Sequence, residues 1–474
     1  MNQDTLILLR AVQRFSRDKN KKLYLVGGFL RDILLNKEKD NPDLDFCIAS
    51  GAINFGRGLA KKLKAGFVVL DKEHGACRVV KKAKDKIYTL DFTDFRGKGL
   101  LGDLKHRDFT INALALDLEK AARGINTADF LDLSGGRKDL KVKLIRMINK
   151  NTFHEDPLRI LRAFSLAAAL NFKIDSLTLK LIKKDRHKLK NVSFERVRDE
   201  LFKIFATGKT HQYLPELDRL NILELVFPEI NALRGIGQGP YHHLDVWQHT
   251  LETVRELEIL FEEIKANKDI QAYLREEISG QRARYGLIKL AALLHDFGKP
   301  ATLRRKGGKI TFHGHERVGM EMAIEVVRRL KLSNEELRAL KNIILRHLRP
   351  GYLSDVDELT PRAVFRFFRD ADKEAVSVLL LSIADQRATK GPLATSISRS
   401  RQEKTANLLI KEYFRKNKEK KAKRILNGNQ VMLKFKLKPS PLIGEILAEI
   451  EELQAIGKIK TKEEAFRAAK KLIK

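Results

Sequence analysis

The chain has 474 residues, and its 93 Lys and Arg against 61 Asp and Glu give a formal net charge of +32 and a pI of about 9.9, which favours a polyanion such as nucleic acid as its partner. No apolar stretch approaches the ~20 residues of a membrane-spanning helix, and Met1–Asp4 does not begin a signal peptide, so no membrane association is expected. Two cysteines, Cys47 and Cys77, cannot make a disulfide framework or a thiolate metal site, so we expect a reducing, cytoplasmic setting.

The length predicts several domains, because a single core rarely exceeds ~250–300 residues. Residues 1–145 mix β-rich apolar runs with flanking helical patterns, and residues 146–232 are nearly all helical in period. A Gly/Pro-rich patch at 234–240 then marks a boundary. We therefore predict a third domain over 233–400 and a tail over 401–474.

The first informative segment is an apolar run followed by two glycines. Leu23–Val26 predicts a strand, and Gly27 and Gly28 would let the backbone after it approach phosphates closely, with Arg31 available to one of them. The plainer interpretation is an ordinary turn after a strand.

Two aspartates follow two residues apart. In a strand, Asp43 and Asp45 would point to the same face, so that both carboxylates can hold the same pair of hard cations such as Mg²⁺. This pattern predicts two-metal chemistry at a triphosphate and an attacking hydroxyl, as in nucleotidyl transfer. The alternative is a solvated Asp-x-Asp on the surface.

A second strand-like alternation covers residues 88–96. It would deliver a third carboxylate, Asp91, to the same edge, where its role would be that of general base towards an RNA 3′-hydroxyl. In the plainer interpretation, Asp91 and Asp94 are exposed residues of an edge strand.

The next motif, at 107–113, contains Arg107 and Asn112, which could hold a triphosphate and a ribose. With this motif in place, the chain resembles the class II tRNA nucleotidyltransferases and bacterial poly(A) polymerases of the DNA polymerase β superfamily. The resemblance implies an α/β head that uses Mg²⁺, CTP and ATP, with tRNA as the partner.

Residues 155–163 resemble the segment that serves this family as a protein template for the incoming base. The resemblance assigns nucleotide binding to Asp156, Arg159 and Arg162. Asp is acceptor-only and Arg donor-only, which matches the pairing edges of C and A. The spacing of Asp156 and Arg159 predicts that they share one helical face, and the alternative is an ion pair on a helix surface. Residues 192–197 resemble the family's next helix start.

The chain departs from the family pattern near this motif. Ser165-Leu166 stands where relatives usually have Arg-Phe, and His106 stands where a second arginine usually precedes Arg107. Neither change affects a proposed metal ligand. The arginine that this chain lacks would lie near the base-reading face, so the choice between C and A is left open.

Histidines are dense after the 234–240 boundary, where seven of the chain's 12 lie between positions 242 and 347. Their order resembles the HD superfamily of metal-dependent phosphohydrolases. Imidazole and carboxylate ligands together suit Mn, Fe, Ni or Zn, and Lys299 would help to neutralise a phosphate. The alternative is scattered structural histidines. The resemblance assigns the metal to His249, His295, Asp296, His315, His347 and Asp385.

The tail carries a basic run at 415–424, which is either a solvated face or a contact to RNA backbone. Segments at 426–432, 438–444 and 461–465 resemble the C-terminal helices of bacterial members of the same family, although Phe435 stands where a glycine is usual.

We predict an α/β nucleotidyltransferase head followed by an all-α neck, an HD-type helical domain and a helical RNA-binding tail. The predicted function is template-independent addition of C and/or A to the 3′ end of tRNA, beside an HD phosphohydrolase centre. Within the same chemistry, a poly(A) polymerase or an enzyme adding only CC or only A is the alternative. An RNA-directed HD phosphohydrolase and a non-catalytic RNA chaperone belong to other classes, and neither explains all three head carboxylates.

Overall fold

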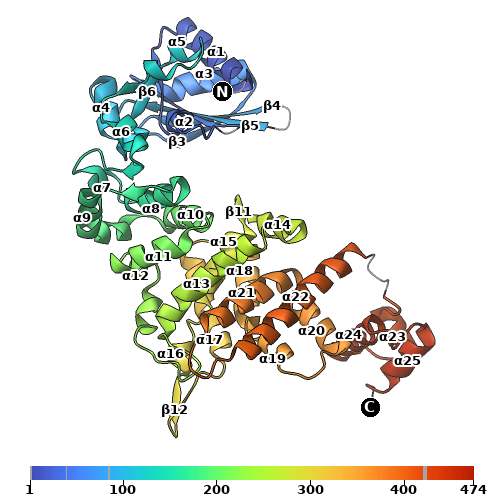
Figure 1. Cartoon of the computed structure of the whole chain (residues 1–474). Coiled ribbons are helices and arrows are strands. Elements are labelled where there is room, and N and C mark those ends of the chain that lie inside the picture. Colours follow the sequence, from blue (N-terminus) through green and yellow to red (C-terminus); the bar gives the residue numbers. More distant parts are fainter. Residues whose placement is uncertain (1–2, 39, 84–85, 420–423, 474) are drawn as a thin grey trace. The chain divides into compact units, whose positions relative to one another are not determined.

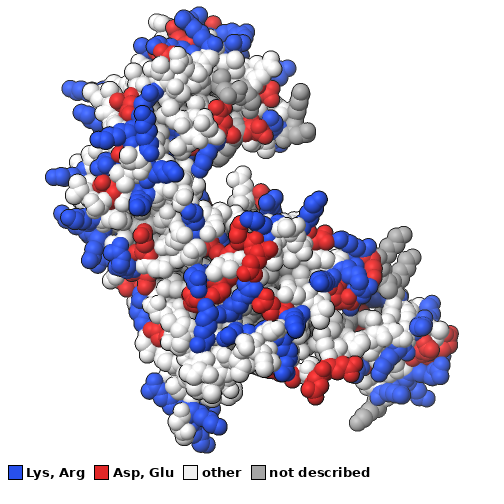
Figure 2. Space-filling model, in the orientation of Figure 1, with Lys and Arg blue, Asp and Glu red and all other residues white. Residues whose placement is uncertain are grey.

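The structure is a computed structural model that describes residues 3–38, 40–83, 86–419 and 424–473 (Figure 1). It divides into two compact units, Met1–Ile204 and Phe205–Lys474. Lys and Arg side chains are spread over the visible face of both units, and in the second unit acidic side chains gather among them (Figure 2).

The first unit is built on a seven-stranded sheet in the order β3-β4-β5-β2-β1-β6-β7. Within it, β2 and β5 run parallel, whereas the other neighbours are antiparallel. A short parallel pair, β8 and β9, follows. The strands are β1 (Leu23–Val26), β2 (Asp43–Ile48), β3 (Gly66–Asp71), β4 (Ala76–Ala83), β5 (Lys86–Asp94), β6 (Leu114–Asp117), β7 (Leu131–Asp132), β8 (Leu144–Ile145) and β9 (Lys173–Ile174).

Helices cover one face of this sheet. Phe55 of α3 packs on Phe92 of β5 with ring centroids 5.3 Å apart, and Phe15 of α1 packs on Phe55 at 5.1 Å. Because neighbouring side chains of a strand alternate between faces, burying Phe46 and Phe92 on this face turns the carboxylates beside them to the other. The helices are α1 (Gln3–Asp18), α2 (Gly28–Leu34), α3 (Ala52–Leu63), α4 (Gly99–Lys105), η1 (Thr110–Asn112), α5 (Leu118–Ala121), η2 (Thr127–Asp129) and α6 (Gly136–Lys141).

A helical segment completes the first unit, as its sequence period predicts. Its elements are α7 (Thr152–Glu155), α8 (Arg159–Leu170), α9 (Ser176–Asp185), η3 (Arg186–Asn191) and α10 (Phe194–Phe205), which spans the division between the units.

One prediction about this segment is wrong: Asp156 and Arg159 do not share a helical face. Helix α7 ends at Glu155, Asp156 is extended with φ −151°, and α8 begins only at Arg159. The reason is Pro157, because the residue before a proline is driven out of the helical region and the proline itself has no N–H to donate.

The second unit is helical apart from two short hairpins. Its central helices α13, α15, α18 and α21 pack on one another. The elements up to the second hairpin are α11 (Thr210–Arg219), α12 (Leu223–Val226), η4 (Pro228–Ala232), α13 (Val246–Glu263), α14 (Lys268–Arg275), β10 (Glu277–Ser279), β11 (Arg282–Ala283), α15 (Arg284–Leu294), α16 (Lys299–Thr302), β12 (Arg304–Lys306) and β13 (Lys309–Thr311).

The rest of this unit contains further helices and the tail. They are α17 (His315–Arg329), α18 (Asn334–Arg346), α19 (Arg349–Ser354), α20 (Pro361–Ala371), η5 (Asp372–Glu374), α21 (Ala375–Ala388), α22 (Ser396–Lys418), α23 (Gly428–Phe435), α24 (Pro441–Ala455) and α25 (Lys462–Lys470). The last three share a small core around Val431 and Ile446, and Arg366 of α20 reaches Glu452 of α24 at 2.8 Å.

The predicted architecture, an α/β head followed by helical parts, is confirmed. Both cysteines are buried in strands, and burial raises the pKa of each thiol to about 12, as is typical of packing residues. Among the described helices, none is long and apolar enough to cross a membrane.

Candidate functional site

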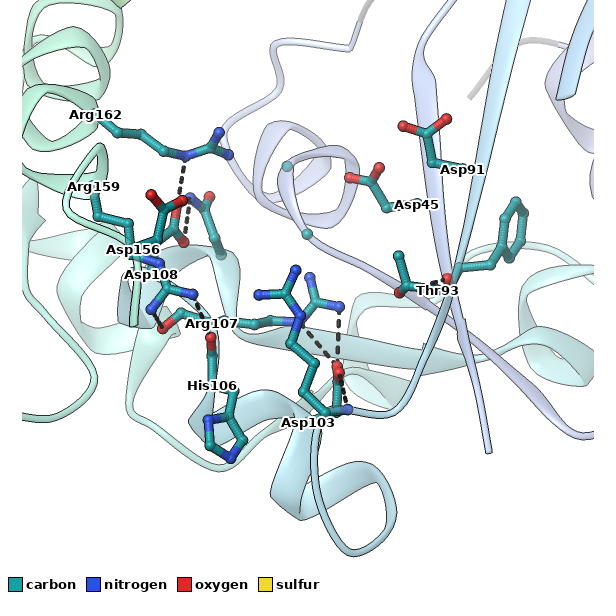
Figure 3. A pocket seen from close by; sticks show the side chains of 15 residues that line it. Asp45, Asp91, Thr93, Asp103, His106, Arg107, Asp108, Asp156, Arg159 and Arg162 are labelled. Atoms are coloured by element: carbon teal, nitrogen blue, oxygen red, sulfur yellow. Dashed lines mark hydrogen bonds and ion pairs between the residues drawn. The ribbon is translucent and has the colours of Figure 1, made fainter. Parts of the chain in front are cut away.

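A cavity of about 260 Å³ lies in the first unit. Figure 3 shows the carboxylates of Asp45 and Asp91 on one side of it and Asp156 and Arg162 on the other. The residues that line it are Gly27, Gly28, Asp45, Phe46, Asp91, Thr93, Arg96, Asp103, His106, Arg107, Asp108, Asn112, Asp156, Arg159 and Arg162.

The parallel pairing of β2 and β5 brings the predicted carboxylates to one face. Asp45 is the register partner of Asp91, and Asp43 lies two residues earlier on the same face of β2, where it is exposed and does not line the cavity. Asp91 is held by Arg78 of β4 through two 2.8 Å hydrogen bonds, which raise the pKa of the guanidinium. Among the described residues, sets of three or more ligand atoms within 4.8 Å of one another occur only in the second unit.

The environment of Asp45 changes its pKa. Burial raises its pKa to about 6, and the neighbouring charges of Asp91 and Asp43 act in the same direction, while Arg107 and Arg162 oppose it. A carboxylate in this environment gains from a nearby cation, so the donors fit a divalent metal ion.

Gly27 sits where a side chain has no room. Its φ is +82°, and a Cβ there would lie 2.8 Å from Oδ2 of Asp45. Arg31 does not line the cavity, because its guanidinium donates to Asn112 Oδ1 at 2.8 Å and to Asp32 Oδ1 at 2.8 Å. The predicted residues Gly27, Gly28 and Asn112 therefore meet at the cavity wall, with Arg31 behind Asn112.

Arg107 points into the cavity and is anchored by Asp103, whose Oδ2 lies 3.1 Å from Nη2. A second buried carboxylate, Asp108, accepts from the backbone of Phe109 at 2.7 Å and from Nδ2 of Asn112 at 3.1 Å. Burial alone would raise the pKa of Asp108, but Arg162 and these hydrogen bonds lower it. Asp108 is therefore an anion that fixes both an amide and a guanidinium.

The proposed base-reading residues all line the cavity, but they do not pair with each other. Asp156 accepts from Arg196 Nη2 at 2.8 Å, so the alternative of an Asp156–Arg159 ion pair is wrong as well. Arg159 is buried and donates to the carbonyl of His106 at 2.6 Å and more weakly to that of Arg107 at 3.4 Å. Arg162 donates to Asp108 at 2.6 Å.

The two departures from the family pattern have local partners. His106 Nδ1 lies 3.0 Å from Glu155 Oε1, so an imidazole links the loop after α4 to the end of α7. Ser165 is buried and donates to the buried carboxylate of Glu200 on α10.

The second unit contains the predicted histidine cluster, and all six residues assigned to it converge. His249 lies on α13, His295 and Asp296 follow α15, His315 begins α17, His347 follows α18, and Asp385 lies on α21. The closest approaches are 2.8 Å between His249 Nε2 and Asp385 Oδ1, 3.2 Å between His295 Nε2 and Asp296 Oδ2, and 3.4 Å between His315 Nε2 and Asp296 Oδ1. The alternative of scattered structural histidines is therefore wrong.

The hydrogen bonds around this cluster prepare it for a metal ion. Nδ1 of His295, His315 and His347 each contacts the carbonyl three residues earlier, at 2.8, 2.9 and 2.7 Å. If each Nδ1 carries its proton, as such a contact requires, the three Nε2 lone pairs face the centre. Nε2 of His295 and both carboxylate oxygens of Asp296 are buried without a hydrogen-bond partner, which fits a bound cation.

Electrostatics keeps two members of the cluster, His347 and Asp385, in the forms that bind a metal. Burial lowers the pKa of His347 to about 3, so its imidazole is neutral. Against the effect of burial, the hydrogen bond from His249 lowers the pKa of Asp385 below its ordinary range. Lys299 Nζ forms an ion pair with Asp296 Oδ2 at 2.7 Å, although the two atoms are not aligned for a hydrogen bond. The same Nζ donates a hydrogen bond to Gln238 Oε1 at 2.6 Å. The predicted position of Lys299 beside the centre is confirmed.

Several contributing residues were not identified from the sequence. Arg78 could have been found from the alternation of β4, since it falls opposite Asp91. Asp103 pairs with Arg107 and Asp108 with Arg162, but no local pattern in the sequence marks either carboxylate as a partner of these arginines. His242, whose ring lies 4.8 Å from that of His249, lies in a loop and has no helical spacing to reveal it.

The basic run at 415–424 lies only partly within the described residues, since 420–423 fall outside them. Its described cations form ion pairs: Arg415 with Glu412 at 2.7 Å and Lys418 with Asp269 at 2.7 Å. This pattern favours a solvated face for the end of α22.

Three segments of the chain match known families. Residues 23–146 match the poly A polymerase head domain, 171–233 match the probable RNA and SrmB-binding site of polymerase A, and 246–389 match the HD domain. The head match contains Asp45, Asp91 and Arg107 of the first site, and the HD match contains all six residues of the histidine cluster.

Similar proteins extend over nearly the whole length. The chain is 30% identical over 451 residues to the A-adding tRNA nucleotidyltransferase of Deinococcus radiodurans, covering 93% of each chain. It is also 30% identical over 455 residues to the CC-adding tRNA nucleotidyltransferase of Thermus thermophilus, covering 94% of this chain and 92% of that one. The Thermotoga maritima CCA-adding enzyme, solved in complex with tRNA, shares the fold with a TM-score of 0.63 at 22% identity, over 100% of this chain and 97% of that one.

Proposed function

This chain belongs to the tRNA nucleotidyltransferase family with a poly(A) polymerase-type head and an HD domain, and we propose that its head adds C and/or A to the 3′ end of tRNA from CTP and ATP. The observation that carries the proposal is the register of Asp45 with Asp91 at the wall of a cavity whose opposite wall carries arginines. No nucleic-acid template is required, because the cavity is lined by protein groups that match a base edge.

The carboxylates supply the chemistry of the transfer step. We assign Asp43 and Asp45 to hold Mg²⁺, which when bound would activate the attacking hydroxyl and neutralise the triphosphate. Asp91 accepts the proton of the RNA 3′-hydroxyl as its oxygen bonds to the α-phosphorus and pyrophosphate leaves. Arg78 holds the Asp91 carboxylate in place before the substrate arrives.

Positive and backbone donors position the triphosphate. Arg107 reaches into the cavity and carries its charge towards the phosphates, while Gly27 and Gly28 leave their backbone exposed to them. Asn112 is assigned to the ribose, and Arg31 orients its amide by donating to Oδ1.

Base selection is assigned to the segment across the cavity. Asp156 offers acceptors and Arg159 offers donors, which suits the edges of C and A and leaves groups unpaired with G and U. For Arg159 this requires exchanging its weakest protein contact, the 3.4 Å one to the Arg107 carbonyl, for an acceptor on the base. Arg162 lines the same wall and completes the set.

The second unit carries a centre that uses divalent metal. We propose a transition metal such as Mn, Fe, Ni or Zn, held by the six converging histidines and aspartates, because mixed imidazole and carboxylate donors suit these ions. When bound, the metal would activate a water for attack on a phosphoester. Lys299 contributes a positive charge beside Asp296 for the phosphate.

The organisation we propose has four parts: a head over 1–145, a neck over 146–232, an HD domain over 233–400 and a tail over 401–474. The ranges of the three matched families support it. The low cysteine count supports a cytoplasmic setting for the enzyme.

The decisive experiment offers the purified protein three tRNA transcripts, ending before the CCA, after the first C and after the second C, with each labelled nucleotide in turn. We expect C or A to be incorporated on at least one of them and G and U on none. Asp45→Asn should reduce incorporation by ~10²-fold or more, whereas Asp296→Asn should not. Long A tails on any RNA end would instead identify a poly(A) polymerase.

A further inference from the structure

The hairpin of β12 (Arg304–Lys306) and β13 (Lys309–Thr311) projects from the second unit as a separate two-stranded sheet (Figure 1). Gly307 and Gly308 form its turn with φ of +55° and +75°, the positive values that a tight two-residue turn needs. Residues 303–312 contain no Asp or Glu. Its exposed cations are Arg304, Arg305, Lys306 and Lys309 (Figure 2).

These four cations have no anionic partner in the described part of the chain, unlike Arg415 and Lys418 of α22. In addition, Lys306 and Lys309 face each other directly across the hairpin. Like charges in that position destabilise a strand pair. A polyanion bound at the hairpin would relieve this repulsion, which points to a ligand outside the protein.

The base of the hairpin is joined to the metal-type centre. The carbonyl of Phe312, the residue after β13, contacts Nδ1 of His315 at 2.9 Å, and the Phe312 ring centroid lies 5.6 Å from Nζ of Lys299. On the other side, the loop at 239–242 approaches Ile310, since a Cβ on Gly239 would lie 3.9 Å from Cβ of Ile310. The base of the charged hairpin therefore contacts residues of the centre and of the loop at 239–242.

The same loop presents an aromatic ring. Tyr241 is 56% exposed, and its neighbour His242 packs on His249 with ring centroids 4.8 Å apart. The loop is held in place, because the Tyr241 carbonyl accepts from Gly391 at 2.8 Å and that of Pro240 from Leu393 at 3.2 Å. An exposed aromatic ring on a loop that contacts a hairpin of exposed cations offers both the stacking and the phosphate contacts by which single-stranded nucleic acid is bound.

We propose that the β12–β13 hairpin and Tyr241 form a docking surface for single-stranded RNA that leads to the histidine centre. The four hairpin cations contact successive phosphates, and Tyr241 stacks on a base. RNA reaches the centre over this surface. The ligand of the centre is therefore distinct from the nucleotide held in the head. The inference rests on the proposed phosphoester chemistry of the second unit only for its catalytic consequence.

The primary test is binding by the full chain of a fluorescein-labelled 12-nucleotide single-stranded RNA at 50–200 mM salt. Three variants are compared with wild type. The hairpin variant carries Arg304→Ala, Arg305→Ala, Lys306→Ala and Lys309→Ala. A control variant removes the same charge from α14 and α18 through Lys268→Ala, Arg275→Ala, Arg338→Ala and Lys341→Ala. The third is Tyr241→Ala. Bound metal and melting temperature are measured for each to verify the fold.

The hairpin variant should bind the RNA at least ~10-fold more weakly than the control variant and reduce the slope of log K against log salt by about 3, since each single-strand phosphate contact contributes about 0.7. Tyr241→Ala should weaken binding by about 10-fold with an unchanged slope. Equal affinity and slope for the hairpin and control variants would overturn the proposal. A hairpin variant that binds RNA as the control variant does but no longer binds phosphatidylserine vesicles would also overturn it.

A second readout separates docking from chemistry. With Mn²⁺ or Ni²⁺ supplied, the hairpin variant should raise the KM for an RNA ending in a 2′,3′-cyclic phosphate by about 10-fold and leave hydrolysis of bis(p-nitrophenyl) phosphate unchanged. If wild type hydrolyses neither substrate, the proposed chemistry of the centre fails, while the binding comparison still decides the docking surface.

Discussion

Asp45 and Gly27 approach each other more closely than a side chain at position 27 would allow. The carboxylate of Asp45 occupies the space of the missing Cβ, and its pKa rises to about 6 because it is buried among other carboxylates. These two residues give the head two separable tests, one of electrostatics and one of space.

The first test is the pH dependence of stability. The folded pKa of Asp45 is about 6 against about 3.9 when unfolded, so the folded state binds its proton more tightly. Its contribution to stability is complete below pH ~4 and is lost as the pH rises through 6, where the ionised group costs at most about 3 kcal/mol. In a chelator, Asp45→Asn should therefore raise the melting temperature by a few degrees at pH 8 and by about half as much at pH 5.

The control for this test is Glu73→Gln, which removes an exposed carboxylate from the turn between β3 and β4. It should change the melting temperature at neither pH. An equal gain for Asp45→Asn at pH 5 and pH 8, measured by calorimetry, would mean that ionisation of Asp45 is not the cause.

The second test is Gly27→Ala. Both Gly27 and Gly51 have a positive φ, +82° and +85°, but at Gly51 the nearest atom to an added Cβ is 4.0 Å away. Gly51→Ala should destabilise the protein by about 1–2 kcal/mol because its backbone is left-handed, and Gly27→Ala by about 1–3 kcal/mol because its φ and ψ of +82° and −147° are accessible almost only to glycine. Only Gly27→Ala should also lower nucleotide addition, because it displaces Asp45. Equal activities for the two variants in the tRNA assay would show that this contact has no catalytic consequence.

At the scale of elements, the link between α8 and the loop after α4 decides how the base-reading segment is held. Arg159 donates to the His106 carbonyl, Arg162 to Asp108, and His106 itself lies beside Glu155. Two contacts thus join α8 to this loop, and a third joins α7 to it. A guanidinium with carbonyl partners can serve either as a base reader or as a brace for the loop.

Substituting Arg159 distinguishes these roles. Arg159→Lys keeps the charge but loses the planar fork, so base reading predicts that the ratio of C or A to G or U incorporation falls by about 10-fold. Arg146→Lys is the matched control, since Arg146 bridges Asp139 and Asp175 and does not line the cavity. An equal loss with all four nucleotides would assign Arg159 to the brace.

The elements also show what the sequence can and cannot predict. Period-two alternation is sufficient to place Asp45 and Asp91 on strands, and the order of His and Asp along the chain is sufficient to assign six converging ligands. Helical spacing alone does not predict the break before α8, because it takes no account of Pro157. Partners such as Arg78 on Asp91 depend on which strands become neighbours, and that is fixed by the tertiary structure.

At the scale of the whole molecule, the two sites lie in different compact units, and each is complete within its own unit. Distant sites without shared partners respond independently to substitution. The net charge of +32, in contrast, belongs to the chain as a whole and favours RNA at both sites.

This arrangement predicts reciprocal losses. Asp296→Asn should remove bound transition metal and any phosphoesterase activity while nucleotide addition stays within about twofold of wild type. Asp45→Asn should do the reverse. Metal content by mass spectrometry and both assays on both variants test this, and loss of nucleotide addition in a folded Asp296→Asn protein would show that the sites are coupled.

The parallel pairing of β2 with β5 also has a kinetic side. Asp45 and Asp91 are neighbours only because the chain returns over β3 and β4 to place β5 beside β2. Such a non-local pairing must close a long loop before it gains any stabilising contact, which makes it a slow step. During synthesis the amino-terminal strands can therefore pair among themselves first, and Asp45 and Asp91 meet only after β5 has emerged from the ribosome. A nascent chain interrupted before Asp91 would then lack the reactive centre that we propose.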